Sequence, residues 1–82
     1  MPLVVRVVEA RGVPVRVQTH VRAIAGGDVV RRAGPWRTSG EWWTEHGGWD
    51  RDEWDVALTD GAIYRIARDR RTGQWVMEGV LD

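Results

Sequence analysis

Side chains able to act as nucleophiles or general bases are scarce in this sequence of 82 residues. It has no cysteine and no lysine, one serine (Ser39) and two histidines, His20 and His46. Covalent catalysis needs a nucleophile near a base that a third group orients, and no motif spacing links either histidine to Ser39. We therefore expect no catalytic residue and a domain that is not an enzyme.

An acidic segment, EHGGWDRDEWD at residues 45–55, raises the question of a metal site. Asp50 and Asp52 match the start of a calcium loop, but Trp54 occupies the third ligand position and the central glycine is missing. One histidine with scattered carboxylates is a poor ligand set for a transition metal. We expect no metal and no cofactor, and we interpret the segment as a solvated acidic loop and strand face.

Tryptophan and arginine are the residue types left for binding, and they alternate in two segments. These are GPWRTSGEWW at residues 34–43 and YRIARDRR at residues 64–71. Trp42 and Trp43 are adjacent, so a strand would turn their rings to opposite faces, and a small fold cannot easily bury both. Exposed tryptophan beside arginine is typical of a protein-binding hot spot. The alternative is a small single-stranded nucleic-acid-binding β-barrel that stacks bases on the same rings.

Short valine-rich runs predict that the first half of the chain begins with a β-hairpin. Residues 3–9 and 13–18 flank Arg11-Gly12, a hairpin signal, and Val13, Val15 and Val17 share one face of the second run. Pro14 has no N–H and is expected at an edge or a strand start. Residues 19–28 fit a helical turn or a strand, residues 29–32 resume strand character, and the Gly-Pro pair at 34–35 is expected to break the chain.

Residues 53–81 predict an antiparallel meander with strands at 53–58, 62–68 and 74–81. Between the first two lies Asp60-Gly61, a signal for a hairpin turn whose two residues both take positive φ. Alternation along the last strand puts Trp75, Met77 and Leu81 on one face. The five core candidates of the meander are Trp54, Val56, Tyr64, Trp75 and Met77. The predicted fold is all-β, a small antiparallel barrel or sandwich of six to seven short strands.

The length allows one domain, residues 1–82, with a hairpin and connector at 1–33 and the tryptophan-rich motif and meander at 34–82. Residues 1–37 carry seven arginines and two acids, whereas residues 38–82 carry five arginines and ten acids, so the net charge is zero. We expect the two halves to pair with each other; two faces that meet different partners are the alternative. Zero net charge argues against nonspecific polyanion binding.

No apolar run approaches the length of a membrane span, about 20 residues, and the first residues do not resemble a secretory signal. We therefore expect a cytoplasmic protein without membrane contact. Gly26-Gly27 and Gly47-Gly48 lack the lysine and following helix of a phosphate-binding loop, so we also expect no small-molecule ligand.

Residues 34–82 resemble the extreme C-terminal domain of ImuB, the catalytically defective Y-family polymerase homologue of the bacterial mutasome, and a related family of small domains of unknown function. The resemblance consists of a Gly-Pro-x-Arg start, a tryptophan pair, an Arg-Asp-x-aromatic strand, a Gly-x-x-aromatic strand and a closing Gly-x-Trp-x-x-x-Gly. These motifs fall on Gly34, Pro35 and Arg37; Trp42 and Trp43; Arg51, Asp52 and Trp54; Gly61 and Tyr64; and Gly73, Trp75 and Gly79.

This resemblance implies a role in translesion synthesis and the DNA damage response, where ImuB is a hub for protein partners. Those partners would be the error-prone C-family polymerase or a RecA-like accessory protein, and no catalytic residue is implied. From the residues themselves, we expect the binding surface among the tryptophans that the meander does not need. The candidates are Trp36, Arg37, Trp42, Trp43 and Trp49. The alternative is that some of these rings only close the open end of the barrel.

Overall fold

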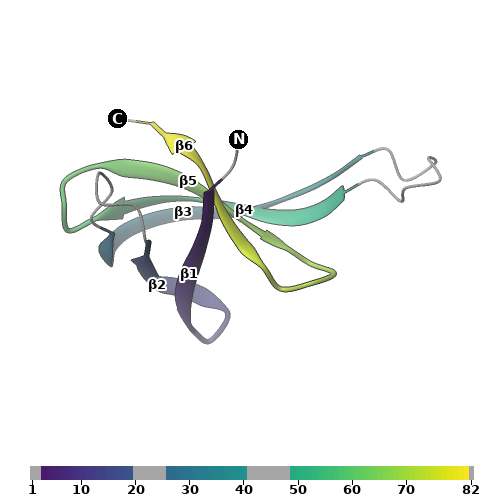
Figure 1. The fold of residues 1–82 in the computed structure, drawn as a ribbon, viewed down its shortest axis with the longest axis horizontal. Helices are drawn as coiled ribbons and strands as arrows, with labels where there is room; N and C mark the ends of the chain where they lie inside the picture. Colours follow the sequence, from purple (N-terminus) through teal and green to yellow (C-terminus); the bar gives the residue numbers. More distant parts are fainter. Residues whose placement is uncertain (1–2, 20–25, 41–48, 82) are drawn as a thin grey trace.

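A computed structural model describes residues 3–19, 26–40 and 49–81, with the backbone alone at 38–40 and 49. Six antiparallel strands form a closed barrel in chain order (Figure 1). They are β1 (Leu3–Ala10), β2 (Val13–Gln18), β3 (Gly27–Gly40), β4 (Trp49–Leu58), β5 (Ile63–Asp69) and β6 (Trp75–Val80). The all-β prediction is confirmed, in its barrel form. The described residues contain no helix that could cross a membrane.

The C-terminal meander lies where the sequence predicts it, as β4, β5 and β6. Trp54 pairs with Ile66 across β4 and β5, and Ile66 pairs with Met77 across β5 and β6. All five core candidates are buried in one cluster with four aliphatic residues from β1, β2, β4 and β5. The cluster contains Trp54, Val56, Tyr64, Trp75, Met77, Val5, Val17, Leu58 and Ile66. Aromatic rings supply much of the buried area in so small a core.

The turn between β1 and β2 differs from the turn between β4 and β5, and the second of these differs from its prediction. Arg11 and Gly12 both have positive φ, 56° and 78°, as two-residue type I′ turns require. At the second turn, Gly61 alone of the predicted pair has positive φ, 87°, so the prediction for Asp60 is wrong. The Asp60 carboxylate instead accepts hydrogen bonds from the Ala62 N–H and the Tyr64 hydroxyl, at 2.9 and 2.6 Å, which fix a longer turn.

Bulges correct two predicted strand faces. The β1–β2 register passes from Val8↔Arg16 to Glu9↔Pro14, so Val15 is an extra residue, and Pro14 is buried with Val17 in place of a Val13–Val15–Val17 face. Pro14 is the second residue of β2, near the predicted strand start. A second bulge between Arg65 and Ile66 of β5, on the β6 side, leaves Leu81 49% exposed, and not on the face of Trp75 and Met77.

Strand β3 continues through Gly34-Pro35, so the expectation of a break there is wrong. The register passes from Ala33↔Asp55 to Trp36↔Glu53, which makes this pair a bulge opposite Trp54. Gly34 has a φ of 122°, and a Cβ atom there would lie 2.8 Å from the Glu53 carbonyl oxygen, so glycine is required. Of residues 19–28, those at 20–25 lie outside the described residues, and β3 begins at Gly27.

Candidate protein-interaction surface

The bulge in β3 decides which way Trp36 faces. Directly opposed residues of an antiparallel pair project from the same face of the sheet. Trp36 lies opposite Glu53, whereas the register of Ala33↔Asp55, continued without the extra residue, would place it opposite Asp52. Because Trp54 points into the core, Glu53 points outward and Trp36 points outward with it. The Trp36 side chain is 46% exposed.

Trp36 begins a row that crosses the outer face of five strands. The row runs from Trp36 through Glu53, Ala67 and Val76 to Val4 on β1. Its two ends are exposed apolar side chains, since Val4 is 54% exposed. The outer face of the sheet therefore presents an apolar residue at each end, with the smaller Ala67 in the middle.

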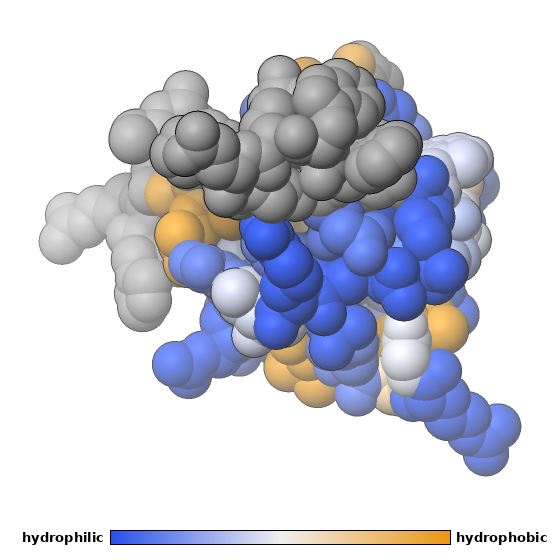
Figure 2. Space-filling model, turned by 90° about the vertical axis from the view of Figure 1, so that its right-hand side faces the viewer, coloured by the Kyte–Doolittle hydropathy of each residue, from blue (hydrophilic) through white to orange (hydrophobic). Residues whose placement is uncertain are grey.

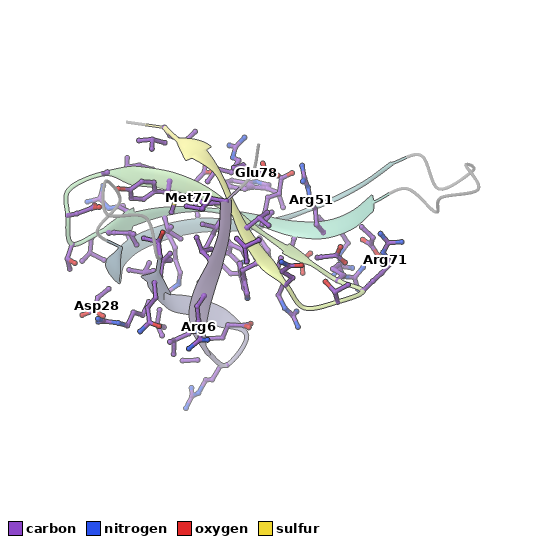
Figure 3. All side chains as sticks on the ribbon, viewed as in Figure 1. Arg6, Asp28, Arg51, Arg71, Met77 and Glu78 are labelled. Carbon is purple, nitrogen blue, oxygen red and sulfur yellow. The ribbon has the colours of Figure 1, made fainter. Side chains whose placement is uncertain are left out.

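Three charged side chains meet over the middle of this row. Arg51 Nη1 lies 2.6 Å from Glu78 Oε1, and Arg51 Nε lies 3.7 Å from Glu53 Oε1. Figure 3 shows Arg51 and Glu78 on the same side of the ribbon. Ala67, which pairs with Glu53, is only 1% exposed although alternation turns it away from the core, and we attribute its burial to this cover.

Arg37 is exposed on the opposite side of β3 from Trp36. It lies opposite Asp52, and its Nε donates to Asp52 Oδ1 at 3.3 Å. Arg70 also approaches Asp52, at 4.0 Å, and binds Asp50 at 3.0 Å. Trp36 and Arg37 are both accessible, but as neighbours in a strand they serve different faces and do not form one joint contact point.

The other three binding candidates are less well placed by the structure. Trp42 and Trp43 lie outside the described residues, as do His20 and His46. Trp49 begins β4 opposite Gly40, and its side chain is not described. The loop-like composition of residues 34–40 is misleading, because this whole stretch belongs to β3.

The acidic segment is part strand, and arginines bind its carboxylates. Asp50 and Asp52 contact Arg70 and Arg37, while Asp55 accepts two hydrogen bonds from Arg65, at 2.8 and 3.1 Å. This contact raises the pKa of the Arg65 guanidinium. Within the described part of the chain, no group of three or more histidine, cysteine, aspartate or glutamate side chains is arranged to hold a metal ion.

We expected the two halves of the chain to form ion pairs with each other, but only a minority of the observed ion pairs join them. Arg37–Asp52 and Arg68–Glu9 cross the boundary, whereas the pairs of Arg51, Arg65 and Arg70 stay within residues 38–82. Four exposed arginines make no ion pair within the described ranges; they are Arg6, Arg11, Arg31 and Arg32. The arginines of the second half pair mainly with acids of the same half, which remain in excess, because acids and arginines face each other across β4 and β5.

A groove on the same outer face is a feature that sequence reasoning missed. It has a volume of about 350 Å³ and is lined by Arg31, Arg32, Ala33, Asp55, Ala57, Ile63 and Leu81. Alanines beside larger side chains leave this hollow. The alternation of β4 places Ala57 on the outer face, but the facing residues of β3 depend on a register shift between Val29 and Arg31 that no sequence pattern revealed.

The end of the molecule seen in Figure 2 is mostly hydrophilic among the described residues, with apolar residues in small separate groups. No protein-family model, no curated protein and no solved structure matches this chain.

Proposed function

We propose that this domain is a non-catalytic protein-interaction module that binds its partner through the outer face of the sheet, centred on Trp36. The carrying observation is the 46% exposure of Trp36, which a one-residue bulge turns away from the core. Tryptophan is among the residue types most enriched at binding hot spots. The core is already closed around Trp54 and Trp75, so a structural role for Trp36 would leave its exposure unexplained.

The setting we propose is the bacterial damage-tolerance machinery. The support is the resemblance of residues 34–82 to the C-terminal domain of ImuB. On this proposal the domain is cytoplasmic, and the partners to test first are the error-prone C-family polymerase and the RecA-like accessory protein.

Single-stranded nucleic acid is the alternative ligand, and one observation favours it. Exposed arginines without ion partners among the described residues include Arg31 and Arg32 on β3, the strand that carries Trp36. Against it, Glu53 lies opposite Trp36 and the chain has no net charge. Nucleic-acid affinity falls steeply with salt because counterions are released, whereas contacts through a buried aromatic ring depend little on salt.

The test is a quantitative pull-down with the immobilised domain, first with the two purified candidates and then with a lysate of DNA-damaged cells. Trp36→Ala should weaken capture about tenfold or more, as hot-spot truncations do. Val8→Ala is the matched control, since Val8 is also an exposed strand residue, 44% accessible, on the distant β1–β2 hairpin. The proposal fails if Trp36→Ala captures the partner as well as the parent, or if binding is to single-stranded DNA and disappears with salt.

A further inference from the structure

We propose that the groove bordered by β3, β4, β5 and Leu81 is a docking site for an acidic peptide segment that carries an aliphatic anchor residue. This inference rests on the proposed function, because it names the chemistry of a partner that covers the same outer face. The groove would be a second contact site for that partner, separate from Trp36.

The floor of the groove is built from small and aliphatic side chains in register. Ala57 of β4 lies between Arg31 of β3 and Ile63 of β5. Leu81 continues this row, because its N–H donates to the Ile63 carbonyl at 2.7 Å. Ala33 lies opposite Asp55 in the next row. The alanines leave a hollow bordered by Ile63 and Leu81, which suits one aliphatic side chain.

The polar rim of the groove carries an excess of positive charge. Arg31, which lies opposite Ala57 in the floor, is exposed and makes no ion pair with any described residue. Its neighbour Arg32 lies opposite the core residue Val56, so its side chain projects from the other face of β3. Among the described lining residues, the one acid is Asp55, and it accepts two hydrogen bonds from Arg65. A carboxylate is the natural partner of the accessible Arg31 guanidinium group, and such charge-assisted hydrogen bonds are the stronger kind. The groove therefore complements an apolar residue flanked by acids.

The same observations disfavour a nucleic-acid strand in this groove. The described residues of the lining include no aromatic side chain on which a base could stack, and their apolar part is aliphatic. Asp55 would also lie near a phosphate backbone.

The groove and Trp36 lie on either side of one ion pair. The row of Ala33, Asp55 and Arg65 separates the groove row from the row of Trp36 and Glu53. The two sites are thus close enough for one partner segment to contact both, with the Asp55–Arg65 pair beneath it.

The experiment is an amide NMR titration of the ¹⁵N-labelled domain with a capped pentapeptide that has one leucine between aspartates. We expect saturable shifts at residues 31–33, 57, 63 and 81, with an affinity in the millimolar range. Two matched peptides are the controls. Asparagine in place of aspartate, or serine in place of leucine, should weaken binding about tenfold or more. An oligothymidylate should not shift these amides.

Variants of the domain test the same site from the other side. Arg31→Gln should weaken binding of the pentapeptide about tenfold, and Ala57→Leu should fill the groove and abolish the shifts. Arg11→Gln is the matched control, because Arg11 is another exposed arginine without an ion partner in the described residues, at the far β1–β2 turn. Amide spectra verify that each variant is folded.

The proposal is overturned if no selective shift appears up to about 10 mM peptide, if the three peptides bind equally, or if oligothymidylate alone shifts the groove amides. Its failure can be separated from that of the proposed function. If Trp36→Ala abolishes partner capture and Ala57→Leu does not affect it, the groove is not a docking site, but the proposed function as an interaction module stands.

Discussion

Tryptophan and arginine occur both in the meander of β4, β5 and β6 and in strand β3, but in different environments. In the meander, Trp54 and Trp75 are buried, and arginines lie within ion-pair distance of acids of the same three strands. In β3, Trp36 is exposed, and Arg31 and Arg32 have no ion partner among the described residues. The difference shows that residue type alone does not tell whether a tryptophan or an arginine is buried, paired or exposed. The register of the strand determines which way each side chain faces.

Strand β3 has fewer neighbouring strands than the meander. It pairs with β4 along its length, but with β2 only at Asp28 and Gly27. Beyond these residues, no other strand of the described chain lies against its second edge. Figure 1 shows β3 and β4 extending together past the remaining strands. The meander, in contrast, has a neighbour on each side of β5.

The largest effect should come from the core tryptophans. Trp54→Ala and Trp75→Ala are each expected to lower the free energy of unfolding by about 3–5 kcal/mol, because each empties a large volume in a small core. Trp75 additionally loses the hydrogen bond from its Nε1 to Glu9, at 3.3 Å. Urea unfolding followed by circular dichroism measures this. A loss below about 1 kcal/mol in both variants would contradict the assignment of stability to the meander.

The stability of the domain should also be sensitive to substitution in the Gly34-Pro35 bulge of β3. Gly34→Ala is expected to cost about 1–3 kcal/mol, because its φ of 122° suits glycine alone and the new Cβ would meet the Glu53 carbonyl oxygen. Gly79→Ala is the matched control, since nothing lies within 4 Å of a Cβ there and its φ is not positive. Equal melting temperatures for the two variants would show that the bulge imposes no such requirement.

An effect of similar size is expected at the turn between β4 and β5. Tyr64→Phe removes the 2.6 Å hydrogen bond to Asp60 and should cost about 1–3 kcal/mol at neutral pH, since the acceptor is charged. The hydrogen bond to Asp60, burial and the charge of Asp60 raise the pKa of Tyr64 to about 12. Because the unfolded tyrosine ionises near pH 10, the parent should lose stability as pH rises from about 10 to 12.

The same contact acts in the opposite direction at low pH. The hydrogen bonds from the Tyr64 hydroxyl and the Ala62 N–H hold the pKa of Asp60 below its usual value. The stability contributed by the ionised carboxylate is therefore present above the unfolded pKa and lost as pH falls through the folded one. Unfolding curves of parent and Tyr64→Phe across pH should converge at both extremes. A constant difference at every pH would contradict this account.

The smallest effect on stability should come from the surface tryptophan. Trp36→Ala is expected to change the free energy of unfolding by less than about 0.5 kcal/mol, since its ring is outside the core cluster. Thermal unfolding beside Trp75→Ala makes the comparison direct. A loss above about 2 kcal/mol would make Trp36 a structural residue.

The sequence predicts the meander well because its signals are local. Alternation in β4 and β5 and the turn between them identify the core residues Trp54, Val56 and Tyr64 without knowledge of any other strand. The sequence does not predict which residues of β3 face outward. A Gly-Pro pair normally predicts the end of a strand, whereas here it forms a bulge that shifts the alternation of the residues after it. The sequence does not predict the groove either, because Arg31, Ala57, Ile63 and Leu81 come from separate parts of the chain.

The central claim is that recognition uses Trp36 while Trp54 and Trp75 build the core. The most direct measurement is an NMR spectrum of the indole N–H resonances before and after addition of the captured partner, with each resonance assigned by a single Trp→Phe variant. The account predicts that the Trp36 resonance shifts or broadens on partner addition, while those of Trp54 and Trp75 stay in place. An unchanged Trp36 resonance in the saturated complex would contradict it.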